Sequence, residues 1–314
     1  MNLIKDIMIG PVDLVVPFVN PNDQEWQQLY KYCSGISEVG ERFRDFSVLK
    51  FMFRSINRYA PCIRLVHLIL ASESQVPSWL NTKSSRLNIV YHRDFIPEKY
   101  LPTFNSNTIE MFLSNIPNVS EHFLYGNDDL LFMKRVDVSD FFTEEGLPKI
   151  AYTSRYKQNP TGFLSTCKRS WLLIEEACGK DKVEMEIGPE GQVPAFIKQH
   201  HGAAVPRLMS FERECFSRFN NEIIQSLTMF RNMETNLNQY IFGNYLLATG
   251  NAVRDNADEV GTYYSKEMNN LDDIENCTAR MACINDTKEM TIDDYIQVVN
   301  KLYKKFPVKS SFEN

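Results

Sequence analysis

Short apolar runs alternate with amphipathic segments along the first half of the chain. Four runs, rich in aliphatic and aromatic residues, have the length and composition of buried strands; they span residues 12–19, 64–71, 87–92 and 122–125. Apolar residues at helical spacing predict an amphipathic helix over 45–59, and a second one over 109–116 that is capped by Asn105 and Ser106. Strands that alternate with helices predict an α/β, Rossmann-like fold, with a mostly parallel sheet flanked by helices.

The second half of the chain is less regular, and its pattern favours helices. Helical spacing covers 167–177, 211–227 and 235–247, so we expect a largely helical insertion over residues 135–278. Within that part, residues 187–194 read as a loop and the polar span 254–276 as a flexible excursion.

The chain end is expected to return to the core formed by residues 1–134. Residues 279–284 (ARMACI) should re-enter the sheet as a strand, and Thr291 with Asp294 forms a capping box for a last amphipathic helix. Residues 1–134, 135–278 and 279–314 are therefore expected to form a single domain.

Composition narrows the classes of partner. The chain of 314 residues has a net charge of −6, which argues against nucleic acid as a partner. Its seven cysteines form no C-x-x-C pair, which favours a reducing compartment. No apolar run approaches the length of about 18 residues that spans a bilayer, and no secretory signal pattern opens the chain, so a cytoplasmic protein is expected.

Polar clusters follow two of the expected strands. In parallel α/β sheets, ligands gather beyond the carboxyl ends of the strands. NPND at 20–23 and GNDD at 126–129 both occupy such ends. Asn127, Asp128 and Asp129 are hard oxygen ligands suited to Mg²⁺ or Mn²⁺. The alternative is a hairpin turn, because Gly-Asn-Asp between two apolar runs favours one.

Basic residues surround the start of the first expected helix. Arg42, Arg44 and Arg54 could bind phosphate oxygens there, with Asp45 beside them. The alternative is a solvated charged face in which Arg44 and Asp45 neutralise each other.

Two further clusters are candidates for chemistry. His200 and His201 are the one adjacent histidine pair, and a histidine near phosphate could act as a general base, whereas His67 and His122 read as structural. Cys283-Ile-Asn-Asp286 repeats the pattern of an apolar run that ends in Asn-Asp, and could contribute to a metal or sugar site or simply lead into the last helix. Dinucleotide-binding, P-loop, hydrolase-elbow and zincin motifs are absent.

Taken together, these segments resemble the Stealth family of sugar-1-phosphate transferases. The resemblance rests on VDLVVPFVNPNDQEW at 12–26, RFRDFSVLKFMFRSINRYAPCIR at 42–64, LPTFNSNTIE at 101–110 and EHFLYGNDDLLF at 121–132, followed by HHGAAVPRLM at 200–209, SLTMFRN at 226–232 and CINDT at 283–287. The chain departs from the family pattern at Phe18-Val-Asn-Pro21, where a Trp-Val-Asp-Gly type turn is common, and in the segment after His201, where a proline usually follows closely.

The resemblance implies a single Stealth-type catalytic domain with a specific reaction. A UDP-hexose or UDP-N-acetylhexosamine would donate its sugar 1-phosphate to a hydroxyl of a glycan or lipid-linked glycan acceptor, with release of UMP. A divalent cation, Mg²⁺ or Mn²⁺, would be held by Asp128, Asp129 and Asp286. His201 or a carboxylate would take the acceptor proton.

The resemblance also implies roles for the remaining candidates. His201, Asp128, Arg231 and Asp45 would be catalytic, and the residues expected to bind the donor are Asn20, Asp23, Arg42, Arg44, Arg54, Asn105 and Asn127. The basic aromatic tail at 301–312 could touch an anionic membrane, which would place the protein at the inner face of the cell membrane, or it could equally be a plain helix end that docks on the domain.

Two other functions remain open from the sequence. A metal-dependent glycosyltransferase would use the same donor but release UDP, and a non-catalytic sugar-nucleotide-binding module would release nothing. The nucleotide that is released distinguishes the two enzymes.

Overall fold

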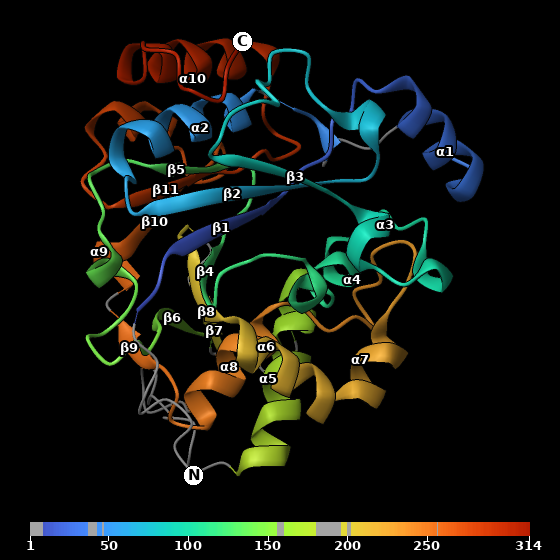
Figure 1. The fold of residues 1–314 in the computed structure, drawn as a ribbon. Helices are drawn as coiled ribbons and strands as arrows, with labels where there is room; N and C mark the ends of the chain where they lie inside the picture. The colour runs from blue at the N-terminus through green and yellow to red at the C-terminus, as the bar shows by residue number, and fades with distance from the viewer. Residues whose placement is uncertain are drawn as a thin grey trace.

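A five-stranded sheet forms the centre of the molecule (Figure 1). The computed structural model describes residues 9–36, 43–45, 47–155, 160–179, 196–199, 202–255 and 257–314. The strand order is β3 (Leu87–Tyr91), β2 (Ile63–Leu70), β1 (Val12–Pro17), β4 (His122–Tyr125) and β8 (Val205–Leu208). Neighbouring strands are parallel except β8, which is antiparallel to β4. The expected α/β fold with a mostly parallel sheet is confirmed.

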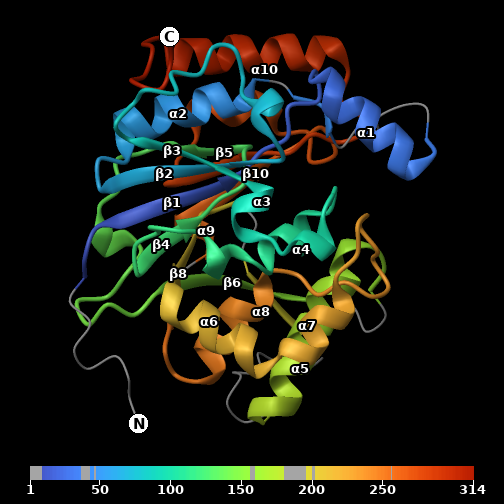
Figure 2. The same cartoon turned by 45° about the vertical axis from the view of Figure 1, so that its right-hand side comes forward.

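Helices cover both faces of this sheet. α2 (Val48–Tyr59) and α10 (Ile292–Lys305) lie on one face, whereas α4 (Ser106–Glu110) and α6 (Met209–Arg218) lie on the other, as both views show (Figures 1 and 2). Strand β1 explains why both faces need cover. Its residues Leu14 and Val16 belong to one hydrophobic cluster and Val15 belongs to the other, because successive side chains of a strand point to opposite faces.

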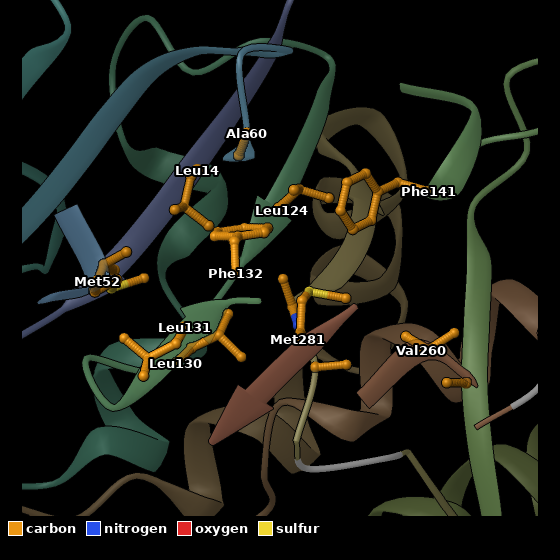
Figure 3. Packing of buried hydrophobic residues seen from close by; sticks show 14 of the residues in the cluster. Leu14, Met52, Ala60, Leu124, Leu130, Leu131, Phe132, Phe141, Val260 and Met281 are labelled. Carbon is orange, nitrogen blue, oxygen red and sulfur yellow. The ribbon is translucent and has the colours of Figure 1, made fainter. Parts of the chain in front are cut away.

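Two smaller sheets flank the central one. The first has the order β10 (Gly261–Tyr264), β11 (Met281–Ile284) and β5 (Leu130–Phe132). The second has the order β7 (Phe196–Gln199), β6 (Lys149–Arg155) and β9 (Val253–Asp255). Figure 3 shows Leu14 and Leu124 of the central sheet beside Leu130, Phe132 and Met281 of the first small sheet. One continuous hydrophobic core therefore joins these two sheets.

The remaining helices lie mainly in the second half of the chain. They are α1 (Gln24–Ser34), α3 (His92–Phe95), α5 (Phe163–Cys178), α7 (Asn220–Ser226), α8 (Tyr240–Ala248) and α9 (Ala257–Val260). The helix expected over 211–227 is divided into α6 and α7 at Phe219, and the helix expected from 235 begins only at Tyr240. The second helix of the first half is also shorter than expected, because α4 ends at Glu110 and a 3-10 turn, Leu113–Asn115, follows it.

Two expectations about the end of the chain are wrong in part. The polar span 254–276 is not simply a flexible excursion, because it contains strand β10, whose Thr262, Tyr263 and Tyr264 pair in parallel with β11. Strand β11 does form within ARMACI, but it pairs with β10 and β5 rather than with the central sheet. Strand β4 has neighbours on both sides, β1 and β8, so it offers no edge to a further strand. Residues 187–194, expected to be a loop, lie outside the described residues.

Candidate active site

A cavity of about 970 Å³ opens at the carboxyl edge of the central sheet. Pro17 and Phe18 at the end of β1, Tyr125 at the end of β4, and Ser106 and Asn107 of α4 contribute to its lining. The position agrees with the general location of ligands in open α/β sheets. The volume lies at the upper end of the range of about 300–1,000 Å³ that is typical of small-molecule pockets.

The turn after β4 crosses from one sheet to another. We call Gly126, Asn127, Asp128 and Asp129 the junction turn, because β4 pairs with β1 and β8 whereas the next strand, β5, pairs with β11. The alternative of a hairpin between β4 and β5 is therefore wrong. Packing is tight at its first position, since a Cβ on Gly126 would lie 3.1 Å from Leu130 Cδ2 and 3.4 Å from Leu14 Cδ1.

The two aspartates of the junction turn are charged groups in an enclosed setting. Burial, followed by the nearby carboxylates of Asp129 and Asp45, raises the pKa of Asp128. Burial also raises the pKa of Asp129 and of Asp45. The Cys283 thiol donates to Asp129 Oδ2 at 3.1 Å, and Asp129 Oδ1 is buried without a hydrogen-bond partner among the described residues. Like charges in a low-dielectric site favour protons or a cation.

The donor set of the junction turn fits a divalent cation that is completed by substrate. Among the residues that the structure describes, no group of three or more histidine, cysteine, aspartate or glutamate side chains is arranged to hold a metal ion. Mg²⁺, however, is usually held by one or two carboxylates together with phosphate oxygens and water. Asp128 and Asp129 line the cavity, and the unpartnered Oδ1 of Asp129 is the kind of oxygen that such an ion requires.

Asp286 is bound to an arginine instead. Arg44 Nε and Nη2 donate to its two carboxylate oxygens at 2.8 and 2.7 Å, and Nη2 also donates to the carbonyl of Thr287. The fork geometry of this pair satisfies the carboxylate in the described structure. The structure therefore brings Asp286 to Arg44, a residue that lines the cavity, rather than to Asp128 and Asp129.

Two of the candidate arginines line the cavity. Arg231 donates from Nη2 to Ser106 Oγ at 2.5 Å, and its Nε is buried without a partner among the described residues. The other candidate arginine that lines the cavity is Arg44. Arg54 lies elsewhere, because its buried guanidinium binds both carboxylate oxygens of Glu313 at 2.9 and 2.7 Å and the Phe306 carbonyl. Arg42, expected to bind phosphate, and the expected base His201 lie outside the described residues.

Three of the expected donor-binding residues instead hold the backbone around the cavity. Asp23 caps α1 and also accepts from Ser74 Oγ and Gln75 Nε2. Asn20 exchanges hydrogen bonds with Gln75 through its backbone. Asn105 caps α4, and its amide nitrogen donates to Thr228 and Asn236 of the segment before α8. These residues shape the cavity, whereas Asn127 lines it directly.

Sequence reasoning missed several titratable residues that line the cavity, among them Glu110 and His92. Glu110 accepts from Tyr125 Oη at 2.9 Å; burial raises its pKa, and that hydrogen bond and the charges of Arg231 and Arg207 oppose the rise. Burial lowers the pKa of His92 to about 4. Both were detectable, because Glu110 lies one helical turn after Ser106 and His92 follows the end of β3.

None of the helices in the described part of the chain is both long enough and apolar enough to cross a bilayer.

Comparisons with known proteins find similarity over the part of the chain that contains the junction turn. Residues 42–150 match the family model described as Stealth protein CR2, conserved region 2. These residues include the junction turn, Glu110 and Arg44.

Curated relatives carry related names. The chain is 40% identical over 144 residues to the exopolysaccharide phosphotransferase cps2G of Lactiplantibacillus plantarum, an alignment that covers 45% of this chain and 42% of that protein. It is 27% identical over 349 residues to the receptor polysaccharide phosphotransferase WefC of Streptococcus gordonii, covering 98% of this chain and 100% of the relative. The capsular polysaccharide phosphotransferase WcwK of Streptococcus pneumoniae is 27% identical over 337 residues, covering 96% and 98%. The first alignment thus spans less than half of either protein.

Proposed function

The chain belongs to the Stealth protein family, and on this premise we propose that it transfers sugar phosphate in the synthesis of a cell-surface polysaccharide. The donor is a UDP-hexose or UDP-N-acetylhexosamine, and the acceptor is a hydroxyl of a glycan or lipid-linked glycan. The observation that carries the proposal is a single cavity in which paired carboxylates, Asp128 and Asp129, meet two arginines, Arg44 and Arg231. Phosphoryl-transfer sites combine these groups to bind and neutralise phosphate.

The proposed reaction exchanges one phosphate ester bond for another. The acceptor hydroxyl loses its proton and its oxygen attacks the phosphorus nearest the donor sugar. A new oxygen–phosphorus bond forms, the bond to the bridging pyrophosphate oxygen breaks, and UMP leaves with that oxygen. The product is a sugar-phosphate-sugar diester.

Residues of this chain supply the charges and the base in this proposal. Arg44 and Arg231 neutralise the phosphoryl group, while Asp128 and Asp129 hold Mg²⁺ or Mn²⁺, with Asp45 close enough to shift the pKa of Asp128. The cation would supply further neutralisation of the pyrophosphate when it is bound. His201 stays the expected base, and Glu110 joins it as a candidate, because a buried carboxyl with a raised pKa is suited to accept a proton at neutral pH.

The cellular setting follows from the acceptor. Lipid-linked acceptors lie at a membrane, and we place the protein in the cytoplasm at the inner face of the cell membrane. Peripheral contact with anionic lipids would involve the exposed Lys304 and Lys309 near the end of the chain, whereas Phe306 and Phe312 of the same segment are buried in the core.

The test is to identify both products. Purified protein is incubated with a panel of UDP-sugars, a capsular oligosaccharide acceptor, and Mg²⁺ or Mn²⁺, and phosphorus NMR follows the reaction. A diester signal together with UMP supports the proposal. Release of UDP would contradict it and indicate a glycosyltransferase, and binding of the donor without any product over the whole panel would indicate a binding module.

A further inference from the structure

Five aromatic rings form a cluster of their own beside the cavity. We call Trp26, Tyr30, Phe43, Phe104 and Phe230 the aromatic wall. Its members come from α1, from the segment before α2, from the segment before α4 and from the segment before α8. Trp26, Phe43 and Phe104 also line the cavity, next to Phe18 and Val19 at the carboxyl end of β1.

The rings hold one another in fixed orientations. Trp26 is stacked on Tyr30 with ring centres 5.4 Å apart, and Phe104 is stacked on Phe230 with centres 5.3 Å apart and planes 8° from parallel. The ring centres of Phe43 and Trp26 lie 5.1 Å apart in an edge-to-face arrangement, and Phe43 is only half-buried. Edge-to-face and offset-stacked rings are favourable arrangements for aromatic side chains, so the wall can be rigid before any ligand arrives.

Positive charge accompanies these rings along the chain. Arg44 follows Phe43 and Arg231 follows Phe230, and both arginines line the same cavity. The cavity also contains carboxylates, at Asp128, Asp129 and Glu110. Flat rings next to guanidinium groups match a nucleotide, because its base stacks and its phosphates are anionic.

From the rings and arginines that line the cavity together we infer that the aromatic wall binds the pyrimidine base of the nucleotide donor, with Phe43 as the ring against which the base stacks. The inference rests on the proposed function for the identity of the donor. It assigns base recognition to aromatic residues. The polar residues Asn20, Asp23 and Asn105, which were expected to bind the donor, are not among them.

Tryptophan fluorescence tests this assignment directly. The chain has three tryptophans, and substituting Trp79→Phe and Trp171→Phe leaves Trp26 as the single reporter inside the wall. UMP should quench this fluorescence in a saturable manner. Ribose 5-phosphate and inorganic pyrophosphate, which lack the base, should bind more weakly and leave the fluorescence nearly unchanged.

Substitution of one ring separates stacking from phosphate binding. Phe43→Leu keeps an apolar side chain of similar size but removes the flat face, so it should weaken UMP binding about tenfold and leave pyrophosphate binding unchanged. Phe163→Leu is the matched control, because Phe163 lines the same cavity but lies on α5, away from the wall. It should leave UMP affinity unchanged. Circular dichroism verifies that both variants are folded.

Two results would overturn the inference. One is equal affinity for UMP and ribose 5-phosphate with equal effects of the two leucine variants; the other is quenching of Trp26 by acceptor oligosaccharide and not by UMP. Either would leave the proposed transfer reaction standing if diester still forms. Conversely, quenching by UMP that is weakened by Phe43→Leu, with no diester from any donor, would support the inference and reject the proposed function.

Discussion

Two aspartate clusters lie at opposite ends of neighbouring strands of the central sheet, one near the amino end of β1 and one beyond the carboxyl end of β4. At the amino end of β1, Asp13 accepts from Arg64, His67 and Ser120, with distances of 2.6–3.1 Å. Beyond the carboxyl end of β4, the carboxylates of Asp129 and Asp45 lie close enough to Asp128 to raise its pKa. The residue type is the same, but Asp13 is fully buried whereas Asp128 and Asp129 are half-buried where they line the cavity, and the partners differ.

This difference appears in the proton affinities. Burial alone would raise the pKa of Asp13, but hydrogen bonds from His67, Arg64 and Ser120 outweigh it and hold that pKa well below its usual range. Burial and like charges instead raise the pKa of Asp128. A buried charge whose hydrogen bonds are satisfied indicates a role in holding the fold. A charge that lacks such partners indicates a ligand site, and it lowers the stability of the folded protein.

The largest expected effect is on folding, at Asp13. Asp13→Ala leaves His67 and Arg64 without their common acceptor, and we expect the free energy of unfolding to fall by about 3–5 kcal/mol. Urea denaturation followed by circular dichroism measures the change. Asp293→Ala, at an exposed position on α10, is the control and should change stability by less than about 0.5 kcal/mol. An equal effect of the two substitutions would contradict the assigned role of Asp13.

Next in size is the effect on turnover at the junction turn. Asp128→Asn and Asp129→Asn should each lower the rate of diester formation about 10²-fold or more, because the charge that we propose to hold the cation is lost. The folded structure should be retained, and Asp128→Asn should be at least as stable as the parent protein. Near-native turnover of either variant would remove that residue from the site, and Asp293→Asn serves again as the control.

A smaller effect is expected in the pH dependence of stability, where the two clusters act in opposite directions. Above about pH 4, folded Asp128 and Asp129 retain protons that the unfolded chain releases, so stability without divalent cations should fall as the pH rises toward neutrality. Below about pH 4, the unfolded chain binds a proton that folded Asp13 does not, so stability should fall as the pH falls.

The double variant Asp128→Asn/Asp129→Asn isolates the first of these contributions. Its stability curve should lie above that of the parent protein by about 1–3 kcal/mol near neutral pH, and the two curves should converge toward pH 4. The fall in stability below about pH 4, which depends on Asp13, should be the same in both proteins. Parallel curves over the whole range would contradict the raised pKa values of the junction turn.

The smallest expected effect is stabilisation by Mg²⁺. At ten times its dissociation constant, the ion should stabilise the parent protein by about 1.4 kcal/mol, and it should not stabilise Asp128→Asn. Asp286→Asn sharpens the test, because the structure pairs Asp286 with Arg44 and we therefore expect that variant to keep the Mg²⁺ effect. Loss of the effect in Asp286→Asn would support the metal ligand set expected from the sequence instead.

The sequence predicted the elements whose causes are local. The apolar runs of β1, β2, β3 and β4, and the capping box of α10, depend on neighbours within a few positions. The structural reading of His67 is also consistent with its hydrogen bonds to Asp13 and Asn88. Pairing of β11 with β10 was not predictable from hydropathy, because β10 is a four-residue strand within a polar span.

Partners distant in the sequence explain why some of the expected site residues do not line the cavity. Arg54 resembles a phosphate ligand by its position in a basic segment, but its partner, Glu313, is 259 residues away. Asn105 likewise binds Asn236, 131 residues away. By contrast, Asp128, Asp129, Arg44 and Arg231 do line one cavity, since the ends of strands and the starts of helices place them at one edge of the sheet.

The junction turn has a consequence for how the protein would lose activity. Its aspartates are attached on one side to the central sheet through β4 and on the other to the small sheet through β5. Strands β5 and β11 are buried in the core that they share with the central sheet. We nevertheless expect the three-stranded sheet to open before the five-stranded one, because fewer strand pairings hold it. Opening of that unit alone would separate Asp129 from Cys283 while the Asp13 cluster remained intact. Mild denaturant should therefore inactivate the protein before it unfolds it.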